Sequence, residues 1–236
     1  DAEAIATAIQ YNTKALLINS PNNPTCAIYT QETLDAICKV CIDNDLWLVS
    51  DDVYWSLSND QHICPRALSG MKDRTIVIQS MSKSHGMTGW RMGWLVCSKE
   101  MAYYLTQHNL VSTYGMNDFI SRAATVALDQ KIGVEEIADT YRKRGETFIK
   151  EIQGVNGLKV LNDPGGMYFM IDIRSITHDA QKFAFGLLDA ESVAIMPGDS
   201  FGPSAAGHIR ISLCQPADRL REAAARLRRF ASTYSE

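Results

Sequence analysis

One lysine of this chain stands in a setting that suits covalent chemistry with a cofactor. Lys83 follows the apolar run 75–78 after a few small polar residues, and Arg91 comes shortly afterwards between two glycines. A lysine just beyond a strand end can form a Schiff base with a carbonyl cofactor. Nearby hydroxyls and an arginine can hold a phosphate. The stretch therefore suggests a lysine that carries pyridoxal 5'-phosphate (PLP).

Three further motifs occur along the chain. Asn-Asn-Pro-Thr spans 22–25, Ser-Asp-Asp-Val-Tyr spans 50–54, and His-Ile-Arg-Ile-Ser spans 208–212. In the last of these, Arg210 lies among apolar residues of a predicted strand, where an unpaired charge would be costly. We expect an anion to meet this arginine, either the carboxylate of a ligand or an internal partner such as Asp172.

The four motifs resemble those of fold-type I aminotransferases, classes I and II, and the resemblance covers nearly the whole chain. It implies the α/β fold of PLP-dependent transferases, with a mostly parallel sheet in a large domain and a small C-terminal α/β domain. It also implies an enzyme, a transaminase, that moves an amino group between an L-amino acid and a 2-oxo acid. The mechanism would be ping-pong, through an aldimine of Lys83.

The resemblance assigns roles to single residues. Asp51 would keep the pyridine nitrogen of PLP protonated, so that the ring can accept electrons, while Tyr54 and Asn23 would bond the ring oxygen. Asp52 stays an alternative to Asp51, although the Asp-x-x-Tyr spacing favours Asp51. The predicted catalytic residues are Lys83, Asp51 and Tyr54; the predicted cofactor ligands are Asn23, Asp51, Tyr54, Ser80, Ser82, Lys83 and Arg91; and Arg210 is predicted to bind the substrate carboxylate.

Plainer interpretations exist for the same residues. Lys83 could be a surface lysine that follows a strand, Tyr54 an ordinary packed aromatic residue, and Arg91 one half of a surface ion pair. The two glycines beside this arginine, Gly89 and Gly93, allow close approach of the backbone.

Other functions share these motifs. A C–S β-lyase would use the same lysine, aspartate and arginine, and a non-catalytic PLP-binding sensor domain would keep the cofactor site. The segments 165–168 and 201–210 are similar to those of arginine–pyruvate transaminases. Cys26 stands where family members usually have glycine or a small residue, which questions the shape of the local turn.

The resemblance also has implications for the rest of the enzyme. Family members carry an upstream segment with a glycine-rich phosphate loop and an aromatic residue that stacks on PLP. Neither is found in this chain, which opens at Asp1. Family members are usually homodimers with shared active sites, so we expect a homodimer here.

Composition narrows the function classes. The net charge of -4 offers no basic surface for nucleic acid, so the expected partners are small-molecule amino acids and 2-oxo acids. No apolar run approaches the ~20 residues of a membrane-spanning helix. Cys38 and Cys41 fall on one helix face with Leu34 and Ile37. We therefore expect reduced core cysteines rather than a metal site, which fits a cytoplasmic protein.

Apolar strands alternate with a helix in the first part of the chain, which favours a parallel or mixed sheet with covered faces. We expect strands at 15–19, 46–50, 75–79 and 94–97, a helix that follows the N-cap Thr30 to about 44, and helical structure over 99–129 with breaks near Gly115 and Asn117. Ligands of open α/β sheets lie beyond strand ends. Asp51 and Lys83 both fall at such positions.

The second part of the chain has its own pattern. We expect a charged helix at 134–153, strands at 166–173 and 209–213, and helices at 180–190 and 217–230. This order of strand, helix, strand and helix indicates a small α/β unit. We therefore divide the chain into residues 1–130, part of the PLP-binding large domain, and residues 131–236, the small C-terminal domain.

Overall fold

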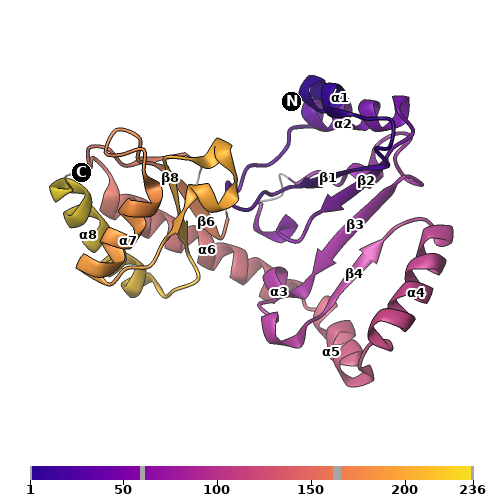
Figure 1. The fold of residues 1–236 in the computed structure, drawn as a ribbon. Helices are drawn as coiled ribbons and strands as arrows, with labels where there is room; N and C mark the ends of the chain where they lie inside the picture. The colour runs from indigo at the N-terminus through magenta and orange to yellow at the C-terminus, as the bar shows by residue number, and fades with distance from the viewer. Residues whose placement is uncertain (1, 59–61, 162–165, 235–236) are drawn as a thin grey trace. The chain divides into compact units, whose positions relative to one another are not determined.

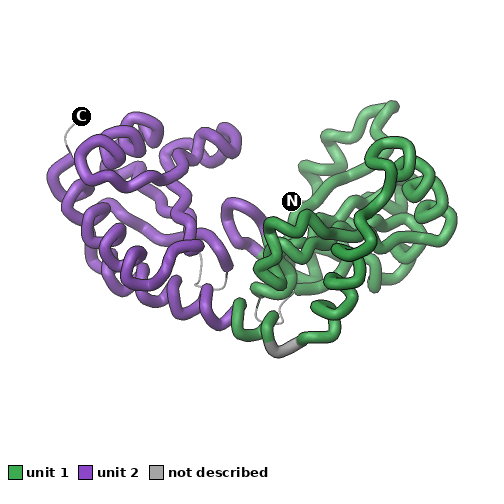
Figure 2. Tube along the Cα trace, turned by 90° about the horizontal axis from the view of Figure 1, so that it is seen from below, with its two compact units in different colours: residues 1–21, 28–137 green, residues 22–27, 138–236 purple. Residues whose placement is uncertain are grey.

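The chain is divided into two compact units in the computed structural model, which describes residues 2–58, 62–161 and 166–234. Unit 1 comprises Asp1–Pro21 and Ile28–Ile137, and unit 2 comprises Asn22–Ala27 and Ala138–Glu236 (Figure 2). The change from one unit to the other thus falls inside a long helix, and a short early segment belongs to unit 2. The domain boundary predicted at 130/131 stays a prediction.

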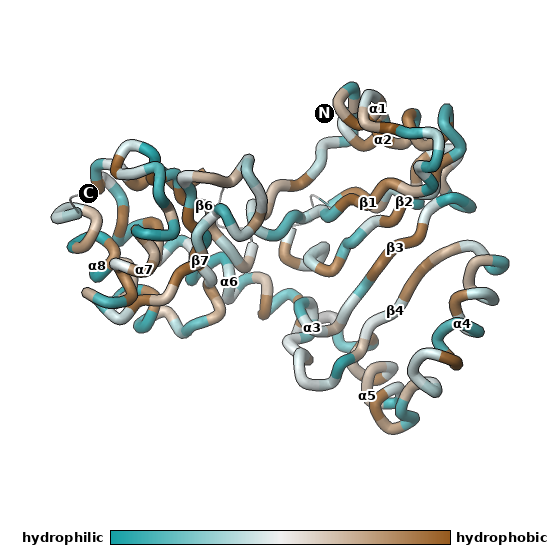
Figure 3. The backbone as a smooth tube through the Cα atoms, viewed as in Figure 1, coloured by the Kyte–Doolittle hydropathy of each residue, from teal (hydrophilic) through white to brown (hydrophobic). Residues whose placement is uncertain are grey.

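Unit 1 contains a four-stranded sheet in the order β1-β2-β3-β4 (Figure 1). Strands β1 (Ala15–Asn19), β2 (Trp47–Asp51) and β3 (Thr75–Ser80) are parallel, and β4 (Gly93–Val96) is antiparallel to β3. Hydrophobic residues dominate the three parallel strands (Figure 3). In β1, however, Ile18 is buried and Leu17 is exposed, so the described residues do not cover both faces of the sheet as predicted. The predicted mostly parallel sheet is confirmed.

Helix α2 (Gln31–Asp43) covers one face of this sheet. The Thr30 side chain accepts a hydrogen bond from the Thr33 backbone N–H at 3.2 Å, so the predicted N-cap is confirmed. The buried face of α2 joins the strands in one apolar cluster that includes Leu34, Ile37, Cys38, Cys41, Ile18 and Leu48. Both cysteines are free, as predicted, and burial raises the pKa of the Cys38 thiol to about 11.

The remaining helices of unit 1 flank the sheet. They are α1 (Ala2–Ala8), the one-turn helix α3 (Met81–Ser84), α4 (Lys99–Thr113) and α5 (Asp118–Leu128). Helix α4 ends at Tyr114 in the left-handed conformation, and Asn117 caps α5 through its side chain. The predicted break in the helical segment is therefore confirmed. Short 3₁₀ turns lie at Trp55–Leu57, Pro65–Ala67 and Thr88–Trp90.

Unit 2 contains a second four-stranded sheet, in the order β5-β6-β8-β7, in which every pairing is antiparallel. Its strands are β5 (Lys159–Val160), β6 (Tyr168–Asp172), β7 (Met196–Pro197) and β8 (His208–Ser212). Its helices are α6 (Lys131–Ile152), α7 (Ala180–Glu191) and α8 (Ala217–Thr233).

The predicted order of long strands and helices in unit 2 is confirmed, but the two short edge strands, β5 and β7, were not predicted. Because β8 pairs between β6 and β7, it runs against both of them. The core of the unit consists of fully buried side chains from the sheet and from all three helices, including Phe148, Phe169, Phe183, Ile209 and Leu227. Gly165, part of the segment compared with arginine–pyruvate transaminases, lies outside the described residues.

No helix among the described residues is long and apolar enough to cross a membrane.

Candidate active site

Lys83 lies directly beyond the end of a parallel strand. Strand β3 ends at Ser80, and α3 begins at the next residue, so the lysine belongs to a single helical turn at the strand's carboxyl end. Its side chain is half-buried, and its Nζ lies 5.8 Å from the ring centroid of Tyr54. No carboxylate of the described ranges forms an ion pair with it. The lysine thus keeps an amine that no acid neutralises, beside an aromatic ring.

Asp51 and Asp52 occupy opposite environments although they are neighbours. Asp51 is the last residue of β2 and is half-buried, and one of its oxygens accepts the Val53 N–H at 3.3 Å. Burial raises the pKa of the Asp51 carboxyl, opposed by the Val53 hydrogen bond and reinforced by the charge of Asp52. In the part of the chain that the structure describes, no cation pairs with Asp51. This carboxylate therefore lacks the positive partner that a protonated ring nitrogen would supply.

Asp52, by contrast, is fully buried and has its own partners. Its Oδ1 accepts a hydrogen bond from Ser50 Oγ at 2.5 Å, and its Oδ2 lies 2.9 Å from His62 Nε2. Both carboxylate oxygens are occupied within the protein, so Asp51 is the better candidate for a ligand. His62 was not singled out by the sequence, because it lies in a loop without a recognisable spacing to Asp52.

The backbone around Asp51 is held by neighbouring strand residues. Its carbonyl oxygen accepts hydrogen bonds from Asn19 Nδ2 at 2.8 Å and from the Ser20 N–H at 3.2 Å. The carboxyl ends of β1 and β2 are therefore tied together, and the direction of the Asp51 side chain rests on a fixed backbone.

The three phosphate candidates lie around α3 and the turn that follows it. Ser80 Oγ accepts the Ser82 N–H at 3.1 Å and so caps α3, and it lies 3.5 Å from the Met92 carbonyl oxygen. Arg91 is exposed and left-handed (φ 53°), with its Nη1 donating to the Thr88 carbonyl at 3.1 Å. Among the described residues Arg91 has no acidic partner, which is against the surface ion pair considered as its alternative.

The two glycines that flank Arg91 differ in their need for glycine. A Cβ atom at Gly93 would lie 2.6 Å from the Gln79 carbonyl oxygen, so the predicted close approach of the backbone is confirmed there. At Gly89 nothing among the described residues lies within 4 Å of such an atom, so a close approach at that position stays a prediction. The difference arises because Gly93 belongs to the β3–β4 pair and Gly89 to an open turn.

Taken alone, unit 1 therefore offers complementary unpaired groups on neighbouring strand ends. Lys83 and Arg91 are cations without an acidic partner among the described residues, and Asp51 is an acid without a basic one. A cofactor that carries a carbonyl, a phosphate and a basic ring nitrogen would satisfy one group with each part. The residues present thus fit PLP.

Arg210, in unit 2, is held without a carboxylate. Its Nη1 donates to Asn23 Oδ1 at 2.8 Å, and its guanidinium carbon lies 4.4 Å from the ring centroid of Tyr168 and 4.8 Å from that of Phe201. Its Nε is buried and has no hydrogen-bond partner. Two aromatic faces and one amide oxygen therefore stabilise a cation whose charge no described acid cancels.

The internal partner considered for Arg210 is engaged elsewhere. Asp172 accepts two hydrogen bonds from the Arg174 guanidinium, at 2.9 and 2.6 Å, and this contact holds the pKa of the Asp172 carboxyl well below its usual range. The interpretation of Arg210 as a partner of Asp172 was wrong. An anionic group from outside the described residues, such as a substrate carboxylate, remains the natural partner.

Asn23 and Cys26 belong to the short segment of unit 2 that approaches β6 and β8. The contact between Asn23 and Arg210 was not predicted, because the two residues are 187 positions apart. Cys26 has a left-handed backbone (φ 54°), and its thiol donates to the Tyr168 carbonyl at 3.4 Å. The left-handed conformation explains why glycine suits this position, and the hydrogen bond shows how a cysteine is accommodated.

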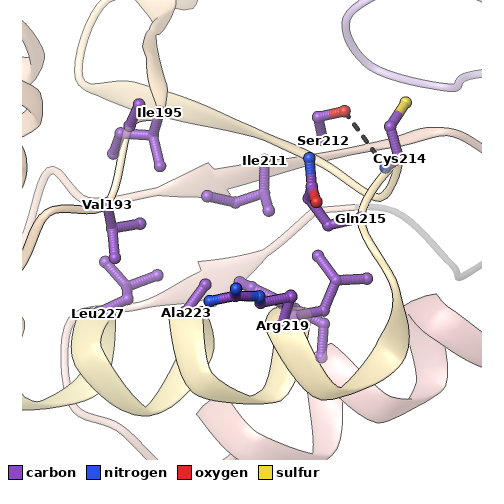
Figure 4. A pocket seen from close by; sticks show the side chains of 12 residues that line it. Val193, Ile195, Ile211, Ser212, Cys214, Gln215, Arg219, Ala223 and Leu227 are labelled. Atoms are coloured by element: carbon purple, nitrogen blue, oxygen red, sulfur yellow. Dashed lines mark hydrogen bonds between the residues drawn. The ribbon is translucent and has the colours of Figure 1, made fainter.

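A pocket of about 220 Å³ lies elsewhere in unit 2, between β8, the segment before β7 and helix α8 (Figure 4). Its walls are mostly aliphatic, with Val193, Ile195, Ile211 and Leu227 among them, and Arg219 lies along its α8 side. None of the residues predicted from the sequence lines it.

The chain matches a family model described as aminotransferase class I and II over residues 1–227. It is 42% identical to arginine–pyruvate transaminase of Pseudomonas aeruginosa over 228 residues, which cover 96% of this chain and 58% of that protein. It is 32% identical to aspartate aminotransferase of Bacillus subtilis over 242 residues, with 99% of this chain and 61% of that protein covered. The chain thus spans about three fifths of these relatives.

Solved structures give the same result. An aromatic aminotransferase from Pyrococcus horikoshii matches with a TM-score of 0.92 at 30% identity, over 98% of this chain and 63% of that one. N-succinyldiaminopimelate aminotransferase from Mycobacterium tuberculosis matches with a TM-score of 0.90 at 28% identity, over 97% and 61%. The four motifs, the fold and these matches agree, and the chain belongs to the aminotransferase class I and II family, whose enzymes depend on PLP.

Proposed function

We propose that the protein is a PLP-dependent aminotransferase that transfers an amino group between an L-amino acid and a 2-oxo acid. The observation that carries the proposal is the setting of Lys83 in a chain of this family. The lysine is half-buried in the helical turn after β3, it lies beside Tyr54, and no described carboxylate pairs with it. A surface lysine without function would need neither the burial nor the aromatic neighbour.

Each residue of unit 1 has a proposed role. Lys83 would bind the cofactor carbonyl as a Schiff base, and Ser80, Ser82 and Arg91 would bind its phosphate. Asp51 would hold a proton on the ring nitrogen, and Tyr54 would donate a hydrogen bond to the ring oxygen. When bound, PLP supplies an electron sink for the bonds at the substrate Cα.

Lys83 would also move a proton. Its amine would take the proton from the substrate Cα and return it at a different atom. The proposed kinetics are ping-pong, with the 2-oxo acid as the second substrate.

In unit 2, Arg210 would bind the α-carboxylate of the amino acid and of the 2-oxo acid. Its planar guanidinium can hold a carboxylate through two parallel hydrogen bonds. Asn23 Oδ1 and the rings of Tyr168 and Phe201 fix that plane before a substrate arrives. For Asn23 we retain the additional proposal of a hydrogen bond to the cofactor ring oxygen.

The similarity to arginine–pyruvate transaminase makes arginine and pyruvate the first pair to test. A homodimer with shared active sites and a cytoplasmic location are further proposals. The second of these is supported by six free cysteines, as expected in a reducing compartment.

The decisive assay supplies the full-length protein and PLP with arginine and pyruvate and measures alanine formation. We expect alanine to appear in step with consumption of arginine, and no turnover when the 2-oxo acid is omitted. A second reaction, with a β-thio-substituted amino acid and no 2-oxo acid, tests for a C–S β-lyase. Release of pyruvate and ammonia there, without transamination of any donor, would contradict the proposal, as would PLP binding without any turnover.

A further inference from the structure

Three side chains form a hydrogen-bonded series next to Asp51, the carboxylate that we assign to the cofactor. Ser50 Oγ, the Asp52 carboxylate and His62 Nε2 follow one another at 2.5 and 2.9 Å. The side chain of Asp52 is 0% exposed and that of His62 is 10% exposed. Because successive strand residues point to opposite faces, Ser50 and Asp51 face opposite sides of β2, and Asp52, directly beyond the strand, bonds to Ser50.

An ionised Asp52 needs a positive partner, because an ionised carboxylate without one is very costly in a protein interior. His62 is the one basic side chain in the described ranges that forms an ion pair with Asp52. The Cys64 thiol also faces this acid: burial first, and then Asp52, raises the pKa of that thiol. A thiol that keeps its proton can donate a hydrogen bond but cannot cancel a charge, so His62 is the group of this cluster whose cationic form would neutralise Asp52. Its other ring nitrogen, Nδ1, is buried without a hydrogen-bond partner among the described residues.

The charge of Asp52 matters for Asp51, which is the residue directly before it in the sequence. After burial itself, the negative charge of Asp52 is the second influence that raises the pKa of the Asp51 carboxyl, and the Val53 N–H opposes both. Those are the groups that act on Asp51 from the described elements around it. Any excess negative charge on Asp52 would therefore favour protonation of Asp51, and a protonated carboxyl could not hold a cationic ring nitrogen.

We propose that His62 is a positioning residue of the cofactor site: by pairing with Asp52 directly beyond β2, it leaves Asp51 as the single effective carboxylate at the end of that strand. The inference rests on the proposed function for its meaning, because Asp51 is assigned there to the ring nitrogen. The pairing and its effect on Asp51 are properties of unit 1 alone.

The test uses the full-length protein without cofactor, with the Asp51 carboxyl carbon followed by NMR as the pH is varied. Glutamine at position 62 keeps an N–H donor for Asp52 and removes the positive charge. We expect His62→Gln to move the Asp51 titration midpoint upward by about one pH unit, since an added nearby negative charge favours the protonated form. The double variant Asp52→Asn/His62→Gln removes both charges and should return the midpoint to the wild-type value.

Two outcomes would overturn the inference. One is an unchanged Asp51 midpoint in a folded His62→Gln protein, and the other is a double variant that titrates like His62→Gln, as a purely structural role would predict. His108→Gln is the matched control, because His108 is an exposed histidine of unit 1 whose partner is Ser112. If His62→Gln does not fold, Asp52→Asn alone decides, since its midpoint must lie at or below the wild-type value and a rise would contradict the proposal.

A second readout connects the pair to the cofactor. We expect the pH below which the affinity for PLP is lost to move upward by about one unit in His62→Gln, together with the Asp51 midpoint, and to return in the double variant. Failure of the wild-type protein to bind PLP would count against the proposed function. The Asp51 titration would still decide the role of His62.

Discussion

The two units present their candidate site residues in different ways. In unit 1, Asp51, Ser80 and Lys83 lie at or just beyond the ends of parallel strands, positions that the sequence around each of them already indicates. In unit 2, Arg210 lies within an antiparallel strand, and its contacts come from distant parts of the chain, with Asn23 187 positions away. Strand-end chemistry is local in sequence, whereas a buried cation is accommodated by long-range contacts.

This difference explains what the sequence could predict. The strands β1 to β4, the cap at Thr30 and the break between α4 and α5 follow from hydrophobic runs and turn residues, and all were predicted. The lysine and aspartate motifs could also be predicted, because each consists of residues that are close together in the sequence. The cation–ring contacts of Arg210 and its hydrogen bond to Asn23 were not, because nothing in the local pattern names the partner.

Two further misses have the same origin. The His62–Asp52 pair joins a strand end to a loop without a spacing signal, and β7 is a strand of two residues, Met196–Pro197, too short for any periodicity. The interpretation that Asp172 might neutralise Arg210 failed because a nearer arginine, Arg174, takes both of its oxygens. A local competitor two residues away outweighed the predicted cross-strand partner.

The largest effect is expected for Lys83→Ala, which removes the central residue of the strand-end group in unit 1. We expect turnover of the full-length protein to fall by at least about 10⁴-fold, because both the covalent link and the proton transfer are lost. The free energy of unfolding should change by less than about 0.5 kcal/mol, because Lys83 makes no ion pair among the described residues. Steady-state kinetics and urea unfolding test the two parts. Transamination at a normal rate would refute the assignment.

A smaller effect is expected for Arg210→Ala, which breaks the long-range half. We expect KM for both the amino acid and the 2-oxo acid to rise on the order of 100-fold, since a charged hydrogen-bonded pair is lost, while the affinity for PLP changes much less. Arg174→Ala is the matched control, an arginine of the same unit whose carboxylate partner is internal. An unchanged KM for Arg210→Ala, or an equal rise for Arg174→Ala, would contradict the account.

The smallest effects sharpen the contrast between a satisfied and an unsatisfied aspartate. Arg174 lowers the pKa of Asp172, so that pair stabilises the fold above the unfolded pKa of about 3.9 and loses this contribution as the pH falls. Burial raises the pKa of Asp51, so its ionisation costs stability at neutral pH. Asp172→Asn should therefore lower the unfolding free energy at pH 7 by about 1 kcal/mol, and Asp51→Asn should leave it unchanged or raise it.

Urea unfolding at pH 7 and at pH 3 measures both variants. The differences from wild type should shrink at the lower pH, where the aspartates of the unfolded chain are protonated. Destabilisation by Asp51→Asn equal to that by Asp172→Asn would show that Asp51 has a structural partner, which would weaken its assignment to a cofactor.

The most direct test of the central claim is to incubate the full-length protein with PLP, reduce it with borohydride, and map the labelled peptide by mass spectrometry. The account predicts a single pyridoxyl group on Lys83, together with loss of the cofactor absorbance band upon reduction. A label on another lysine, or no label at all on the folded full-length protein, would contradict it.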